Sequence, residues 1–481
     1  MKPVWVLWWS CLALCGHCGP GVVMRVTQKW MDYILTEGIE VFRYKIQHDR
    51  LPNILGSTRV FGMVEYAITG ISVLEFDTSD IVVIPTPPKS ILLNVKGAMA
   101  KVFGQWNVKH WLINDNGNFS LRVSGVTMKV QFTTLEDSAA RPSVILSSCQ
   151  SEVKNAKVHL SGGASWLYNL FTGFLERPIR ENLNKRLCPG VGEVIQILQK
   201  ELATFQVIAD LDAYNKIDYS LINPPRVEMT HIDLDLKGAV YHPESRDQQE
   251  DNITPIILPD TRQSMILLGL SEYFFNNLGK TYFIRNVLKM TITPEQYPEE
   301  WGVQTSDYAQ IIPKIKKYYT ESKFVRLIFQ ASKPPMINLT SQLTMKLEGI
   351  LEAMALRKDM SPETFFATDV VATFIADMMR LSNFTLYLSF TLQSFHFQNF
   401  RSHVGEASIP ELERSLGHML KEHVVQEINR GLSGGIPMPS LANVTLKEPA
   451  ITVNPGCLVM AVDMVYTPWK ELVANLPDHG P

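Results

Sequence analysis

Apolar side chains recur at steps of three and four residues between Ser147 and Leu202, and this spacing predicts a long amphipathic helix. The stripe consists of Trp166, Leu167, Leu170, Phe171, Phe174, Leu175, Ile179, Leu183, Leu187, Val191, Val194, Ile195 and Leu198. A helix of roughly thirty residues spans on the order of 50 Å. We therefore expect an elongated body with an apolar seam along it. Pro178 lies inside the stripe and predicts a kink near Glu176 and Arg177, or two helices that share a face.

The order of short helix, strands, long helix and strands is expected twice along the chain, as a repeat of pattern rather than of sequence. In the first half these elements are placed at Val22–Gly38, 51–135, the stripe described above and 203–241. In the second half they are placed at Ser271–Leu288, 303–400, Ile409–Leu432 and 440–468. Met345–Met379 contains many helix-favouring residues, but tertiary context can still make it a strand.

The repeat divides the chain into two similar domains, at 19–241 and 265–481, joined by a polar, proline-containing linker at 242–264. Residues 1–18 have the pattern of a secretory signal peptide, with Lys2 before a short apolar run and small residues at its end. No later apolar run approaches the length needed to span a membrane. The sequence thus predicts a secreted, extracellular two-domain protein.

Apart from supporting secretion, composition changes this prediction little. The formal net charge of the 481-residue chain is −3, which argues against a nucleic-acid partner. Five sequons are typical of a secreted glycoprotein, and they place candidate glycans on Asn118, Asn252, Asn338, Asn383 and Asn443. Removal of the signal peptide leaves three cysteines, of which Cys457 lies beside Leu458-Val459-Met460 and is expected to be a buried thiol.

Motifs for catalysis or metal binding are weak. His418 and His423 are five residues apart and point in different directions on a helix, so a solvated face explains them better than zinc. Ser161-Gly162-Gly163 has neither the spacing nor the lysine of a phosphate loop, and no Gly-x-Ser-x-Gly elbow occurs. The sequence therefore predicts a protein without catalysis, metal or cofactor, and disfavours a secreted hydrolase.

Ordered matches in both halves make the chain similar to the family of bactericidal/permeability-increasing and lipopolysaccharide-binding proteins. They include Gly19-Pro20-Gly21-Val22-Val23, Gly117-Asn118-Phe119, Ser147-Ser148-Cys149, Trp166-Leu167 before Cys188, Gly269-Leu270-Ser271 with Tyr273-Phe274-Phe275-Asn276, Gly435-Ile436-Pro437-Met438-Pro439 and Asp463-Met464-Val465-Tyr466. Within this family, three motifs most resemble the branch called BPI fold-containing family C: Pro178-Ile179, Cys188-Pro189 and Asp218-Tyr219-Ser220.

The resemblance implies an α+β fold, a boomerang-shaped tandem of two barrels. Each barrel is a twisted antiparallel sheet wrapped around a long helix, and a central β-sheet joins them. It also implies a disulfide between Cys149 and Cys188, with two buried free thiols as the alternative. An apolar pocket under each barrel would take phospholipid or other acyl chains. The resemblance also implies peripheral contact with a membrane or lipid surface.

The repeat places each pocket between a short and a long helix. The candidate lining is Val26, Trp30, Leu170 and Phe174 in the first half, and Tyr273, Phe274, Leu278, Leu416 and Leu420 in the second. Such residues also build ordinary cores, so a protein-binding scaffold without lipid stays an alternative.

The basic tip of the bactericidal members is weak in this chain. The matching stretches, Ser57–Tyr66 and Gln105–Leu112, contain only Arg59 and Lys109 as full cations, with Glu65 opposing them. Phosphate recognition favours dense Arg and Lys. Lipopolysaccharide binding in innate defence is therefore the second hypothesis, after lipid binding.

Overall fold

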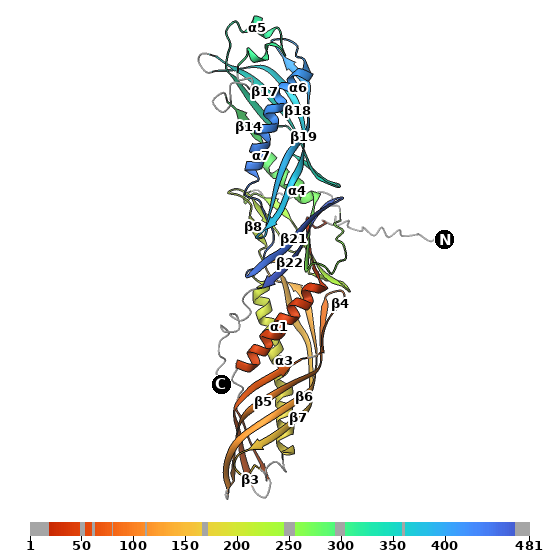
Figure 1. Cartoon of the computed structure of the whole chain (residues 1–481), viewed down its shortest axis with the longest axis vertical. Helices are drawn as coiled ribbons and strands as arrows, with labels where there is room; N and C mark the ends of the chain where they lie inside the picture. The colour runs from red at the N-terminus through yellow and green to blue at the C-terminus, as the bar shows by residue number, and fades with distance from the viewer. Residues whose placement is uncertain are drawn as a thin grey trace, which may run out of the picture.

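The computed structural model describes residues 19–48, 53–59, 63–78, 80–110, 113–165, 172–244, 255–293, 304–357 and 361–466, without the side chains of a few of these, Phe174 and Leu420 among them. The molecule is elongated, with a curled sheet towards each end and a third sheet across the middle (Figure 1). This is the expected tandem arrangement of two sheet-and-helix halves.

The N-terminal sheet is antiparallel, has the strand order β2-β3-β5-β6-β7, and carries β4 on one part of β5. Its strands are β2 (Ile54–Arg59), β3 (Met63–Asp77), β4 (Asp80–Thr86), β5 (Ser90–His110), β6 (Ile113–Glu136) and β7 (Pro142–Ser161). Burial alternates along β5, so one face of the sheet turns inward. Gly97 and Gly125 adopt positive φ where the β5–β6 register shifts, and such bulges increase the twist that curls the sheet.

In the described part of this half, two helices accompany the sheet, α1 (Gln28–His48) and α3 (Gly173–Leu202) (Figure 1). The helix expected at Val22–Gly38 begins six residues later than predicted, because Val22–Thr27 forms strand β1. β-branched residues in this segment pair with strands on both sides, which overrides the local helical spacing. Of the two alternatives at Pro178, two separate helices were wrong, because α3 runs as one helix with Pro178 in its second turn. The proline costs one backbone hydrogen bond there, and the alternative of a kink stays a prediction.

The central sheet has the order β10-β11-β1-β13-β22-β21 and draws strands from both halves. Its members are β10 (Arg226–Val227), β11 (His231–Leu236), β1, β13 (Ile266–Ser271), β22 (Cys457–Tyr466) and β21 (Val444–Asn454). The antiparallel pair β1–β13 lies at its middle, with Val22 opposite Leu270 and Val26 opposite Ile266. Each of these two strands leads directly into a helix, β1 into α1 and β13 into the helix that begins at Glu272. The order of strand, helix and curled sheet therefore occurs once in each half, which confirms the repeat of pattern.

A small sheet, β12-β9-β8, lies beside the central sheet. It is built from β8 (Ile208–Asp210), β9 (Lys216–Asp218) and β12 (Ala239–Tyr241).

The C-terminal sheet has the order β14-β15-β17-β18-β19-β20, with β16 on β17. Its strands are β14 (Lys289–Ile292), β15 (Val325–Ala331), β16 (Met336–Leu339), β17 (Leu343–Leu356), β18 (Pro362–Ser382), β19 (Thr385–Ser402) and β20 (Ile436–Pro437). The ambiguous segment Met345–Met379 therefore forms strands, because β17 and β18 are paired on both sides. A 3-10 turn η4 (Asp307–Ala309) and α5 (Ile315–Tyr318) interrupt the predicted run of strands at 303–400.

The helices of the second half agree with their predicted positions to within a few residues. Helix α4 (Glu272–Ile284) begins after Ser271, whose side chain accepts the Phe274 N–H. The long helix expected at Ile409–Leu432 consists of α6 (Ile409–Met419), a π-helical turn η5 (Leu420–Val424) and α7 (Val425–Gly431).

Polar side chains of the long helices bind the backbone of the neighbouring strand in both halves. In the first half, Asn184 Oδ1 accepts the Val153 N–H at 2.8 Å. In the second, Asn429 binds both the N–H and the C=O of Phe390, at 2.8 and 2.9 Å. These side chains satisfy backbone groups where the sheet leaves them unpaired, and so fix each helix in place.

Candidate functional site

A cavity of about 300 Å³ lies in the N-terminal half, between the sheet, both of its helices and the central sheet. Helix α1 contributes Trp30, Met31, Ile34, Leu35, Gly38, Ile39 and Phe42, and helix α3 contributes Leu187, Val191, Val194, Ile195, Leu198 and Leu202. The inward positions of β4 to β7 and the central strands complete the wall. This volume lies at the lower end of the ~300–1,000 Å³ range of small-molecule sites.

The cavity wall is apolar. Its described residues include no Asp, Glu, His, Lys, Arg or Cys side chain, and the hydroxyl residues among them are Thr78, Thr134, Ser143 and Ser440. The Thr134 hydroxyl is already engaged, since Oγ1 lies 3.1 Å from the Lys89 carbonyl oxygen and 3.2 Å from that of Pro225. The site can therefore exclude water and hold hydrocarbon, but it offers no buried charge for acid–base chemistry.

The C-terminal half also contributes to this wall. Phe384 reaches it from the turn between β18 and β19, and Met464 reaches it from β22. The segment after β20 contributes Pro439, Ser440 and Leu441. The cavity is thus completed by residues from both halves of the chain.

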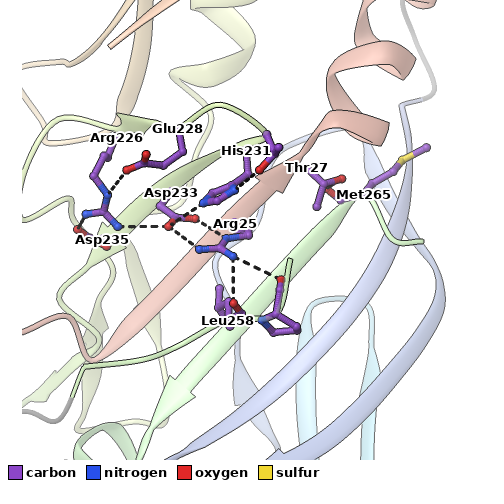
Figure 2. Close-up of polar contacts among 11 residues, drawn as sticks. Arg25, Thr27, Arg226, Glu228, His231, Asp233, Asp235, Leu258 and Met265 are labelled. Carbon is purple, nitrogen blue, oxygen red and sulfur yellow. Dashed lines mark hydrogen bonds and ion pairs between the residues drawn. The ribbon is translucent and has the colours of Figure 1, made fainter. Parts of the chain in front are cut away.

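Charged residues occupy the reverse face of the central strands. On β1, Met24 and Val26 line the cavity, whereas Arg25 between them contacts Asp233 with two hydrogen bonds of 2.8 Å. Figure 2 shows Asp233 at the middle of this cluster, with Arg226 and His231 around it and Leu258 on the far side of Arg25. The cluster joins β1, β10, β11 and the segment before β13 behind the apolar wall.

Two of the first-half candidates line the cavity, Val26 from β1 and Trp30 from α1. Leu170 lies outside the described residues, as does the side chain of Phe174. The sequence pattern missed the wall formed by β4 to β7, although the alternation at Val126, Met128, Val130 and Phe132 was visible. Alternation predicts a buried face, but it does not distinguish a filled core from a hollow one.

The second-half candidates lie in two different core clusters. Phe274 is fully buried, stacks on Tyr219 and meets Phe275 edge to face, and Leu278 packs against the same cluster. Leu416 belongs to another cluster with Phe397 and Leu412. Tyr273 lies against Gly21, and the Leu420 side chain is outside the description. A second acyl site in this half stays a prediction.

The structure contains a disulfide between Cys149 on β7 and Cys188 on α3, with Cα atoms 5.8 Å apart. It ties the helix that lines the cavity to the sheet opposite. Cys457 is a buried free thiol, as expected, and burial raises its pKa. Four of the sequon asparagines, Asn118, Asn338, Asn383 and Asn443, are exposed, and Asn252 lies outside the described residues.

The two stretches expected at the basic tip lie side by side at the far end of the N-terminal sheet. Glu65 on β3 faces Lys109 on β5 directly across the strands, and Arg59 ends β2. Opposite charges at such a pair weaken the positive potential of the tip. Within the described ranges, no cluster of three metal-ligating side chains occurs, and no helix there is both long and apolar enough to cross a membrane.

Comparison with known proteins identifies the family. Models of the N-terminal and C-terminal domains of the LBP/BPI/CETP family match residues 31–199 and 209–466. A bactericidal permeability-increasing protein from Sebastes schlegelii is 26% identical over 93% of this chain and 96% of its own length. The human BPI fold-containing family C protein is 26% identical over 93% and 89%. A crystal structure of lipopolysaccharide binding protein has the same fold, with a TM-score of 0.67 and 24% identity over 93% of this chain and 99% of that one. The chain belongs to the LBP/BPI/CETP family.

Proposed function

We propose that this protein is a secreted, non-catalytic lipid-binding protein that holds the acyl chains of a phospholipid-like lipid in the cavity of its N-terminal half. The observation that carries the proposal is the continuous apolar wall around about 300 Å³ of space. Each buried methylene of an acyl chain contributes about 0.8 kcal/mol. Binding would thus be driven by removal of hydrocarbon from water, without a chemical step.

Gly38 provides a direct test, because it lines the cavity and a Cβ added there meets no atom within 4 Å. In Gly38→Phe the ring would occupy the cavity, and replacing a glycine inside a helix also favours the helix by roughly 0.5–1 kcal/mol. We expect this variant to stay folded and to lose the lipid held in this cavity. Native mass spectrometry of the purified protein and of its lipid extract measures both.

Gly431→Phe is the matched control, since Gly431 also lies in a helix with no atom within 4 Å of an added Cβ, and it lines neither described cavity. A Gly38→Phe protein that is folded and still carries the normal amount of lipid would overturn the proposal. A wild-type protein that never carries lipid would favour the scaffold.

A second acyl site in the C-terminal half, near Tyr273, Phe274, Leu278, Leu416 and Leu420, belongs to the same proposal. Phe274 is 0% exposed, so Phe274→Asp would disturb the core as well as any pocket. The number of bound lipids is the better measurement. One lipid retained by folded Gly38→Phe would support the second site, whereas complete loss would argue against it.

Lipopolysaccharide binding in innate defence is the second candidate function, and the names of the relatives favour it. The cross-strand pair of Glu65 and Lys109 at the tip disfavours it, because a dense cationic surface is what binds phosphates strongly.

A further inference from the structure

The apolar cavity stops at one level along both helices and along the strands β3, β5 and β6, in the direction of the far end of the N-terminal sheet. The last lining residues are Phe42 on α1, Phe76 on β3, Ala98 on β5, Val126 on β6 and Leu187 on α3. Beyond this level the same faces continue as a filled core, in which Val102 and Val123 are 4% and 3% exposed and Ile46 and Leu183 pack against the same cluster. The last lining residues therefore form a floor that closes the cavity against this core.

Phe42 is the residue that spans this floor. Its ring meets Phe76 edge to face, with the ring centroids 5.3 Å apart. The ring also reaches α3, because a Cβ added at Gly190 would lie 3.6 Å from Phe42 Cε2. The side chain thus starts on α1 and contacts both a strand and the other helix. A ring held between α3 and β3 in this way closes the space that separates them.

The opposite end of the cavity lies near the surface. Its wall there includes Ser440 and Leu441, which are half-exposed. Thr134 and Ser143, two other hydroxyl residues of the wall, lie towards the same end, near the turn between β6 and β7. A second cavity of about 40 Å³ adjoins the main one there, between α1, α3 and β22. A bound lipid would keep its polar part at this end, because polar groups are costly in an apolar site, and would extend its hydrocarbon towards Phe42.

We propose that Phe42 determines which acyl-chain lengths this cavity accepts, by setting the longest chain that fits. The inference rests on the proposed acyl function of the cavity and deepens it. Helix α1 lines the cavity from Trp30 to Phe42, a length of about 18 Å. An extended chain advances roughly 1.2 Å per bond, so this length corresponds to about 16 carbons. A longer chain would have to displace the Phe42 ring or leave carbons in water, and either costs the affinity that its added methylenes would contribute.

Lysophosphatidylcholines with one saturated chain of about 12 to about 22 carbons, kept dilute enough to stay monomeric, test the limit by competition in native mass spectrometry. For the full-length wild-type protein we expect affinity to rise roughly four-fold per methylene up to about 16 carbons and then to stop rising. Phe42→Ala removes the ring and should lengthen this limit by about two to four carbons. The ratio of its affinities for chains of about 20 and about 16 carbons should exceed the wild-type ratio by at least about ten-fold.

Phe400→Ala is the matched control and should keep the wild-type limit. Phe400 is also a half-buried ring with an aromatic neighbour, Phe366, at 5.3 Å, and it lines neither described cavity. Gly38→Phe, which fills the cavity, gives the background from any other site. Phe42→Leu, which keeps an apolar side chain, should lengthen the limit in the same direction and serves if Phe42→Ala does not fold.

Three results would overturn the role of Phe42 while leaving the acyl function intact. They are a wild-type affinity that keeps rising to the longest chain, an unchanged limit in the folded Phe42 variant, and an equal shift in Phe400→Ala. If none of the probes binds the wild-type protein, the acyl function itself fails.

Discussion

Asp233 is the residue on which the polar side of the central sheet depends. Its side chain is 4% exposed, it accepts both hydrogen bonds from Arg25, and Arg226 lies 3.2 Å away (Figure 2). Arg25 also donates to the carbonyl oxygen of Leu258 at 3.1 Å. A buried ion pair contributes little net stability compared with an apolar pair, but removing one partner leaves the other charge buried without compensation.

We expect Asp233→Ala to lower the free energy of unfolding by about 3–5 kcal/mol, because Arg25 would remain buried and unpaired. Denaturant titration followed by fluorescence and by circular dichroism measures this loss. Arg226→Gln is the control: the Arg226 side chain is 49% exposed, and its loss should cost less than about 1 kcal/mol. Equal and small effects of the two changes would contradict a central role for Asp233.

At the scale of elements, the helices were more predictable than the site. The stripe from Ile179 to Leu198 and the amphipathic segment Ser271–Leu288 are local signals, and they correspond to α3 and α4. Local signals failed at Val22–Thr27 and in part of Met345–Met379, where pairing on both sides overrides helical propensity. The cavity could be predicted only in part, because alternation along β4 to β7 does not distinguish a filled core from a hollow one. The central strands that close it also pair at long sequence separation.

The disulfide is expected to stabilise the long helix against its sheet. Peptide mapping without reduction should recover Cys149 linked to Cys188. Replacing both cysteines by alanine should lower the free energy of unfolding by roughly 3–4 kcal/mol, since the bridge closes a loop with a sequence separation of 39 residues. Cys457→Ala, at a buried free thiol, should leave the bridge intact. A peptide in which Cys457 is bonded to either partner would contradict this assignment.

At the scale of the whole molecule, the distribution of charge bears on what the far end of the N-terminal sheet can bind. Residues 20–240 contain 23 Lys and Arg and 22 Asp and Glu residues, so this half has almost no net charge. Long-range attraction to a phosphate-rich surface needs an excess of cations, and it weakens with salt.

We therefore expect lipopolysaccharide binding to be weak and to fall further between low and physiological salt, as measured by titration. Glu65→Lys should strengthen it, because the change removes the anion opposite Lys109. Glu363→Lys, at the other end of the molecule on β18, is a control with the same change in net charge. Nanomolar affinity that persists at high salt would show that binding does not depend on these charges.

The position of β1 in the central sheet also constrains how the chain can be made. Val22–Thr27 pairs with β11 and β13, and β13 pairs in turn with β22 near the end of the described chain. During synthesis, more than 200 residues must be added after β1 before either of its partner strands, β11 or β13, has been made. Closing such long loops is slow, and an unpaired apolar strand is prone to aggregate. Assembly of the apolar cavity, whose wall includes Met464, is therefore a late event that requires nearly the whole polypeptide.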